Sequence, residues 1–157
     1  FRRVLFRSAG GIWSHDDIAA MLEKGASGVQ MGTRFIGTHE CDAADTFKEV
    51  LLKSTKEDIQ LFKSPVGYPA RGVRTNLIQM VEKKEGPAIR CVSNCVSPCH
   101  RGQEAKAVGY CIADRLFDAY NGKVETGLFF TGANGYKLDE IISVKELMTK
   151  LVHGETY

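Results

Sequence analysis

The sequence predicts an α/β fold, and three observations support this prediction. An apolar run ends in Gly10-Gly11, a second apolar run ends in Gly32-Thr33, and a segment with helical periodicity separates them. A strand, a glycine turn, a helix and another strand in this order form one βα unit that leads into the next strand. Glycine at both strand ends lets backbone N–H groups approach a ligand closely.

The helix between the glycine turns has a clear start and a clear end. Ser14 is expected as the N-cap, and Asp17, three residues later, is its partner in a capping box. Gly25 is expected just after the last turn, where the chain leaves the helix. One face of the helix carries the apolar residues Ile18, Met21 and Leu22.

The second strand suggests where such a unit belongs in a larger fold. Val29 and Met31 alternate with Gln30, as in a short buried strand. In an eight-stranded α/β barrel, a phosphate-binding site is commonly formed by the loops after the last two strands and a nearby helix N-terminus. The paired glycine turns predict a site of this kind, although a double glycine by itself is also typical of a plain turn.

This region resembles the nitronate monooxygenase (2-nitropropane dioxygenase-like) family. The resemblance rests on Gly10-Gly11-Ile12, on residues 17–22 and on residues 25–35, and it extends from about Ala9 to Val152. It implies an FMN-dependent (β/α)8 TIM barrel related to the flavin-dependent enoyl-ACP reductase II. It also implies a cofactor site for the FMN phosphate made of Gly10, Gly11, Gln30, Met31, Gly32 and Thr33.

The chain is short for a complete barrel, since it has 157 residues and a barrel typically has about 250. With the resemblance, this predicts the C-terminal portion of a barrel: its last two strands in residues 9–36, then a mostly helical C-terminal extension in residues 37–157. Residues 1–8 carry three arginines where a buried strand should be apolar, so we expect a non-native or truncated end. No catalytic residue is assigned, because the catalytic histidine of the family lies upstream of this region.

The resemblance implies oxidation of alkyl nitronates with dioxygen, or reduction of a substrate with NAD(P)H through the flavin. One alternative is an enzyme like the flavin-dependent enoyl-ACP reductase II, acting on an enoyl thioester. Two others are a different phosphate-binding barrel, such as the inosine-monophosphate dehydrogenase type, and a non-catalytic four-cysteine metal-binding module. We expect the isolated chain to be inactive and poorly stable, because two barrel strands leave unpaired edges.

Four cysteines form the second unusual feature, in the cysteine-rich loop 91–111. They are Cys91, Cys95, Cys99 and Cys111, with the spacing C-x3-C-x3-C-x11-C. Four thiolates suit zinc or an iron–sulfur cluster, although this spacing matches no standard zinc knuckle. Unliganded thiols that pack as small hydrophobes and redox-active thiols are the other interpretations. Cys41 stands alone and is expected to be structural.

The rest of the chain predicts helices and short strands. Helices are expected at 43–53, from Thr75 or Asn76 to 84, at 110–120 and from Ser143 on, with a strand at 58–63. In the last helix, Glu146 should complete a capping box. Its buried face is expected to contain Val144, Leu147, Met148 and Leu151.

Two loops carry a functional and a structural interpretation side by side. In residues 64–71, Arg71 could pair with an anionic substrate or simply face solvent. Tyr68 likewise could have a functional role or belong to a purely structural loop. In the glycine-rich turn 131–136, the resemblance implies a segment beside the active site, while the turn residues alone indicate a plain connection.

Composition and charge restrict the class of protein. Apolar residues make up 43% and charged residues 25% of the chain, as in an average globular domain. The net charge of +2 is too small to argue for nucleic acid or an anionic membrane as a partner. With no apolar run long enough for a membrane span and no signal peptide, a cytoplasmic enzyme acting on small molecules is expected; a homodimer is left open.

Overall fold

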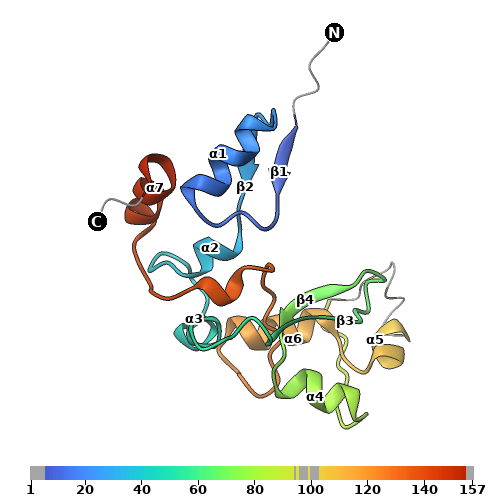
Figure 1. Ribbon diagram of the computed structural model, residues 1–157. Coiled ribbons are helices and arrows are strands. Elements are labelled where there is room, and N and C mark those ends of the chain that lie inside the picture. Colours follow the sequence, from blue (N-terminus) through green and yellow to red (C-terminus); the bar gives the residue numbers. More distant parts are fainter. Residues whose placement is uncertain (1–5, 94, 96–98, 100–102, 155–157) are drawn as a thin grey trace.

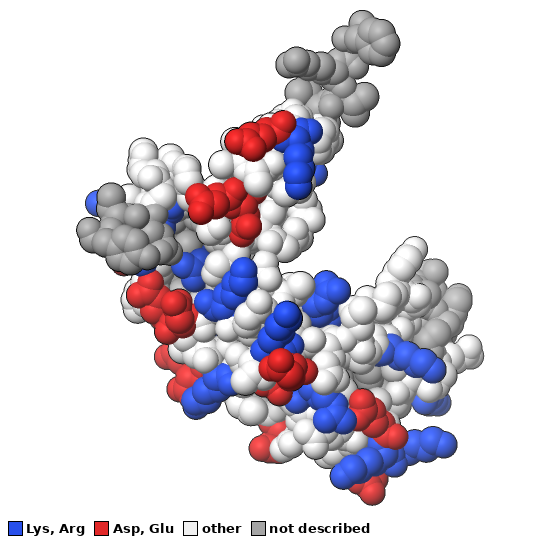
Figure 2. All heavy atoms as spheres, viewed as in Figure 1, with Lys and Arg blue, Asp and Glu red and all other residues white. Residues whose placement is uncertain are grey.

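A computed structural model describes this chain over residues 6–93, 95, 99 and 103–154. Its strands form two separate two-stranded sheets, one parallel and one antiparallel. The parallel sheet lies with α1 and α7 in one part of the molecule, and the antiparallel sheet lies among α4, α5 and α6 in the other (Figure 1). On the face seen in Figure 2, acidic and basic side chains are interspersed. The net charge of the chain is +2.

The N-terminal βα unit has the predicted order of elements. Strand β1 (Arg7–Ala9) and strand β2 (Gly28–Gln30) are parallel neighbours, joined by helix α1 (His15–Glu23). The capping box is confirmed, because the Ser14 hydroxyl accepts from the Asp17 N–H and the Asp17 carboxylate accepts from the Ser14 N–H. Burial opposes the charge on Asp17, but hydrogen bonds from the backbone N–H groups of Trp13 and Ser14 outweigh it and lower its pKa.

The prediction of buried strands in this unit is wrong for this chain. β1 starts at Arg7, which is exposed, and β2 ends at Gln30, so Met31 lies outside it. Within β2, Val29 is half-buried and Gln30 is exposed. Each strand pairs with the other alone in the described structure, and its other edge has no strand beside it. The suggested strand at residues 4–6 lies outside the described residues, apart from Phe6, which is exposed and not in a strand.

The C-terminal region has a core of its own. Helix α3 (Asp45–Leu52) buries Leu51 against Phe129 and Leu138, and strand β4 (Ala70–Val73) adds Val73 to the same cluster. A second cluster joins helix α4 (Asn76–Glu82) to Tyr110 and Leu128. Among the described residues, both clusters are built without β1 and β2, although Trp13 and Ile36 pack at the edge of the first.

Helix α7 (Val144–His153) returns the end of the chain to the N-terminal unit. Leu147 and Leu151 are buried with Ile142 and pack against Ile18, Met31 and Phe35. The ring Nδ1 of His15 lies 3.0 Å from the Leu151 carbonyl oxygen. Met148 was expected on this buried face, but it is 43% exposed, because the contact with α1, Met31 and α2 covers a narrower stripe of the helix.

Several predicted elements are confirmed, with shifted ends. Strand β3 (Ile59–Phe62), α3, α4 and α7 lie where the sequence places them, and the helix expected from Tyr110 begins two residues later as α6 (Ile112–Tyr120). At the start of α7, the Ser143 hydroxyl accepts from the Glu146 N–H, as predicted. The Glu146 carboxylate does not complete the box; it lies 3.5 Å from the Lys150 Nζ.

Strand β4 was missed by the sequence analysis. It pairs antiparallel with β3, and Gly72 lies opposite Gln60. Arg71 and Gly72 interrupt the apolar alternation that normally marks a strand. The glycine is needed there, because a Cβ at Gly72 would collide with the carbonyl oxygen of Phe129.

Three further elements complete the described chain. Helix α2 (Thr33–Ile36) follows β2, helix α5 (Gln103–Val108) precedes α6, and a 3-10 turn, η2 (Gly135–Lys137), lies between α6 and α7. Gly109, with a φ of 101°, separates α5 from α6. Among the described residues, none of the helices is both long and apolar enough to cross a membrane.

Candidate functional site

Three loops meet beyond the C-terminal ends of β1 and β2. They are residues 10–13 after β1, residues 31–33 after β2 and the glycine-rich turn 131–136. The Asn134 Nδ2 donates to the carbonyl oxygen of Gly11 at 2.7 Å, and the Gly132 N–H donates to the Thr33 Oγ1 at 2.7 Å. The turn is thus attached to both strand ends, although it lies about a hundred positions later in the sequence.

The glycines in these loops leave open space in front of the backbone. Gly10 and Gly11 have φ values of 84° and 74°, which side chains of L-residues rarely adopt. A Cβ placed on Gly10, Gly11 or Gly32 would have no atom within 4 Å. This is the geometry that allows backbone N–H groups to reach a bound anion.

Thr33 is held in place by the glycine-rich turn. Its hydroxyl oxygen accepts from Gly132, which leaves the hydroxyl proton free to donate to another group. A Cβ on Gly132 would stand 3.0 Å from the Thr33 Oγ1, so a glycine permits this close contact.

The structure brings some of the predicted cofactor residues together and not others. Gly10, Gly11, Gly32 and Thr33 lie in the loops after β1 and β2, and both loops are hydrogen-bonded to the glycine-rich turn. Gln30 is exposed at the end of β2. The Met31 side chain packs against the buried residues of α7, so it belongs to the hydrophobic core between α7 and the N-terminal unit.

Arg34 is a candidate residue that the sequence analysis missed. It follows Thr33 directly, is only 7% exposed, and its guanidinium lies 4.8 Å from the centre of the Trp13 ring. Its Nε is buried and has no hydrogen-bond partner among the described residues. The only tryptophan of the chain, placed two residues after the double glycine, was the available signal, but its partner could not be read from the sequence.

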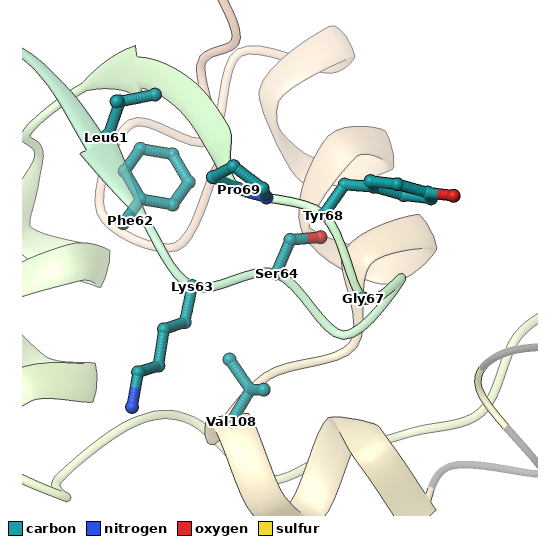
Figure 3. Close-up of a pocket in the computed structure, with 8 residues that line it drawn as sticks. All are labelled: Leu61, Phe62, Lys63, Ser64, Gly67, Tyr68, Pro69 and Val108. Atoms are coloured by element: carbon teal, nitrogen blue, oxygen red, sulfur yellow. The ribbon is translucent and has the colours of Figure 1, made fainter.

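Residues 61–64 and 67–69, together with Val108, line an open groove of about 490 Å³ (Figure 3). Tyr68 is 78% exposed and points away from the Lys63 side chain. The Tyr110 hydroxyl fixes one side of the loop by donating to the Lys63 carbonyl oxygen at 2.6 Å. The carbonyl oxygen of Arg71 accepts from the Thr131 N–H at 3.2 Å, so this hairpin is joined to the glycine-rich turn.

The four cysteines of the predicted metal site line one small cavity. Cys99 is buried, Cys95 and Cys111 are half-buried, and Cys91 is exposed; all four are free thiols. Within the described part of the chain, no group of three or more His, Cys, Asp or Glu side chains is arranged to hold a metal ion. The structure therefore brings the thiols to one place without a formed ligand set.

The sequence matches the family model described as nitronate monooxygenase over residues 7–154. The chain belongs to the nitronate monooxygenase family. A "Probable nitronate monooxygenase" of Staphylococcus aureus (strain Newman) is 32% identical over 79 residues, which are 50% of this chain and 22% of that protein. The family match makes a different phosphate-binding barrel or a separate metal-binding module unnecessary as an explanation.

Two solved structures share the fold of this family member. FabK from Thermotoga maritima has a TM-score of 0.75 and 27% sequence identity, over 97% of this chain and 44% of FabK. The nitroalkane oxidase from Streptomyces ansochromogenes has a TM-score of 0.65 and 21% identity, over 96% of this chain and 40% of the oxidase. The predicted α/β class is confirmed. The chain spans about a fifth of the length of its curated relative and less than half of each solved structure.

Proposed function

We propose that this chain is the C-terminal portion of an FMN-dependent (β/α)8 barrel oxidoreductase of the nitronate monooxygenase type. Its own part in the enzyme is to hold the phosphate of FMN. The observation that carries the proposal is the meeting of three glycine-bearing loops around Thr33, at the C-terminal ends of two parallel strands. Phosphates bind at this place in α/β barrels.

The residues present fit a phosphate group. The space beside Gly11 and Gly32 is open where a Cβ would stand, so a ligand has room to approach the backbone there. The Thr33 hydroxyl retains a proton to donate, and the next residue, Arg34, carries a buried positive charge. Several N–H and O–H donors together with one nearby cation stabilise a bound dianion.

The exposed strands support the barrel interpretation. In a complete barrel, each parallel strand has two neighbours and is covered on both faces. β1 and β2 have one strand neighbour each, and every residue of both is exposed or half-buried. We infer that further barrel strands cover them in the whole enzyme. The isolated chain should therefore be poorly stable.

Bound FMN would supply the redox chemistry through its isoalloxazine ring. The chain's residues would position it: Gly11, Gly32, Thr33 and Arg34 at the phosphate end. The substrate is proposed to be an alkyl nitronate with dioxygen as the oxidant. An enoyl thioester with NAD(P)H stays compatible with the same phosphate loops.

A comparison of FMN with riboflavin tests the phosphate site. Riboflavin lacks the phosphate, so fluorescence titration of the chain should show FMN binding at least tenfold more tightly. Thr33→Val should weaken FMN binding about tenfold, the equivalent of 1.4 kcal/mol for a hydrogen bond to a charged group, and leave riboflavin binding unchanged. Thr149→Val, on the exposed face of α7, is the matched control. Equal binding of FMN and riboflavin would contradict the assignment.

A further inference from the structure

Four cysteines from two separate segments line the same cavity. Cys91, Cys95 and Cys99 belong to the connection between α4 and α5, whereas Cys111 is the N-cap residue of α6. All four line one void, together with Ile89, Ser93, Ala105 and Ile112. The fold thus gathers every cysteine of the chain except Cys41 around one point.

The size and lining of this cavity favour a single ion. Its volume is about 10 Å³, which is room for about one water-sized sphere. An iron–sulfur cluster of several atoms is too large for this void. A water molecule would need two to four polar partners, and apart from the Ser93 hydroxyl and the thiols the lining side chains are aliphatic. Thiolates, by contrast, are preferred ligands of zinc.

Packing alone accounts poorly for the four cysteines. Free cysteine behaves as a small hydrophobe and is normally buried, but Cys91 is exposed and Cys95 is half-buried. No helix or strand lies among the described residues between α4 and α5. Small proteins often fasten such a segment with a structural metal ion.

Positive charge is available where four thiolates would need it. Arg90 precedes Cys91 directly, and its guanidinium lies 3.1 Å from the Asp114 carboxylate. Cys111 stands at the positive end of the nine-residue helix α6. Asp114 is buried and also paired with Arg115, so it is already engaged as a structural group.

We propose that Cys91, Cys95, Cys99 and Cys111 bind one zinc ion as a tetrahedral tetrathiolate site. Binding exchanges four thiol protons for one Zn²⁺, with no change of oxidation state. The thiols are not yet arranged as a ligand set, so the side chains must turn toward the cavity as the ion enters. The ion would fasten the α4–α5 connection to the start of α6. This site is independent of the proposed flavin site.

Metal content and cobalt substitution test the proposal on the chain as it stands. We expect one equivalent of zinc per chain by elemental analysis, and a cobalt-loaded form with the absorption of a tetrahedral thiolate complex. Cys95→Ser and Cys111→Ser should each lower zinc affinity at least a hundredfold, while Cys41→Ser, away from the cavity, should not change it. Absence of bound zinc after titration, or equal loss in the Cys41→Ser control, would overturn the proposal.

Thiol labelling of the unsubstituted chain provides a second test that does not depend on the folding of the variants. With zinc bound, only Cys41 should react quickly with an alkylating reagent, and all five cysteines should react after a chelator is added. Rapid labelling of all five in the presence of zinc would refute the site. So would a loss of two hydrogens per pair by mass spectrometry before labelling, because it would identify a disulfide in its place.

Discussion

The hydroxyl oxygen of Thr33 accepts a hydrogen bond of 2.7 Å from the backbone N–H of Gly132, 99 positions later in the chain. This bond joins the turn after β2 to the glycine-rich turn 131–136. It also directs the Thr33 hydroxyl proton away from Gly132, since the oxygen already serves as an acceptor there. The contact therefore both assembles the candidate site and sets what Thr33 can offer to a ligand.

Gly132→Ala should weaken FMN binding about as much as the loss of one hydrogen bond, roughly tenfold. A Cβ would stand 3.0 Å from the Thr33 Oγ1 and displace the hydroxyl. Gly28→Ala is the matched control, because a Cβ there meets no atom within 4 Å. Flavin titration of both variants checks this. Identical affinities for the two would mean that the Gly132–Thr33 contact does not shape the site.

Arg34→Met should lower FMN affinity about tenfold or more, because it removes the buried positive charge that we propose for the phosphate end of the cofactor. The unfolding free energy should change by less than about 1 kcal/mol, since the lost contact with the Trp13 ring is offset by removal of a buried, unpartnered Nε. Urea unfolding and flavin titration, run together, separate the two effects. Arg74→Met, which removes a partly exposed ion pair with Glu82, should leave FMN binding unaltered. A large loss of stability without loss of binding would count against a phosphate role for Arg34.

Asp118→Asn should destabilise the chain at neutral pH by about 3 kcal/mol, because it breaks a buried ionic network on α6. Asp118 lies 2.9 Å from Arg115 and 3.0 Å from Lys123, and it accepts from the Thr126 hydroxyl at 2.8 Å. Glu49→Gln, in an exposed pair with Lys53, should cost no more than about 0.5 kcal/mol in the same urea titration.

The same carboxylate predicts a loss of stability in acid. Burial raises the pKa of Asp118, but the hydrogen bonds from Lys123 and Thr126 and the charge of Arg115 outweigh it and lower the pKa below its ordinary value. A lowered folded-state pKa stabilises the fold above the unfolded pKa of about 4, and this contribution disappears as the pH falls through the folded-state value. Unfolding measured from pH 7 to pH 3 should show a smaller decline for Asp118→Asn. An equal decline in both proteins would refute this.

The raised pKa of Tyr110 predicts that the protein loses stability as the pH rises above 10. Burial raises the pKa of Tyr110 to about 12, and its hydroxyl donates to the Lys63 carbonyl oxygen. A raised folded-state pKa gives full stabilisation below the unfolded pKa of about 10, which is lost as the pH rises toward 12. Tyr110→Phe should therefore reduce stability at pH 8 by about 1–2 kcal/mol and flatten the decline above pH 10. Tyr120→Phe, at an exposed position, is the control.

The local features of this chain could be predicted because each depends on residues close together in sequence. The capping box of Ser14 and Asp17 uses residues three positions apart, and the glycine at position 25 ends the same helix. By itself, the sequence thus determined helices α1, α3, α4, α6 and α7, the glycine turns and the α/β class, whereas the short helices α2 and α5 were not expected from it.

The tertiary structure decided what lies far apart in sequence. β4 became a strand through its pairing with β3, although its residues lack a strand pattern. Arg34 is buried with its guanidinium over the Trp13 ring, and the Thr33 hydroxyl accepts a hydrogen bond from Gly132. The four cysteines line one cavity because the start of α6, which carries Cys111, lies beside the other three. Local propensity acts within a few residues, whereas these contacts depend on which surfaces are buried together, and that is settled by packing of the whole chain.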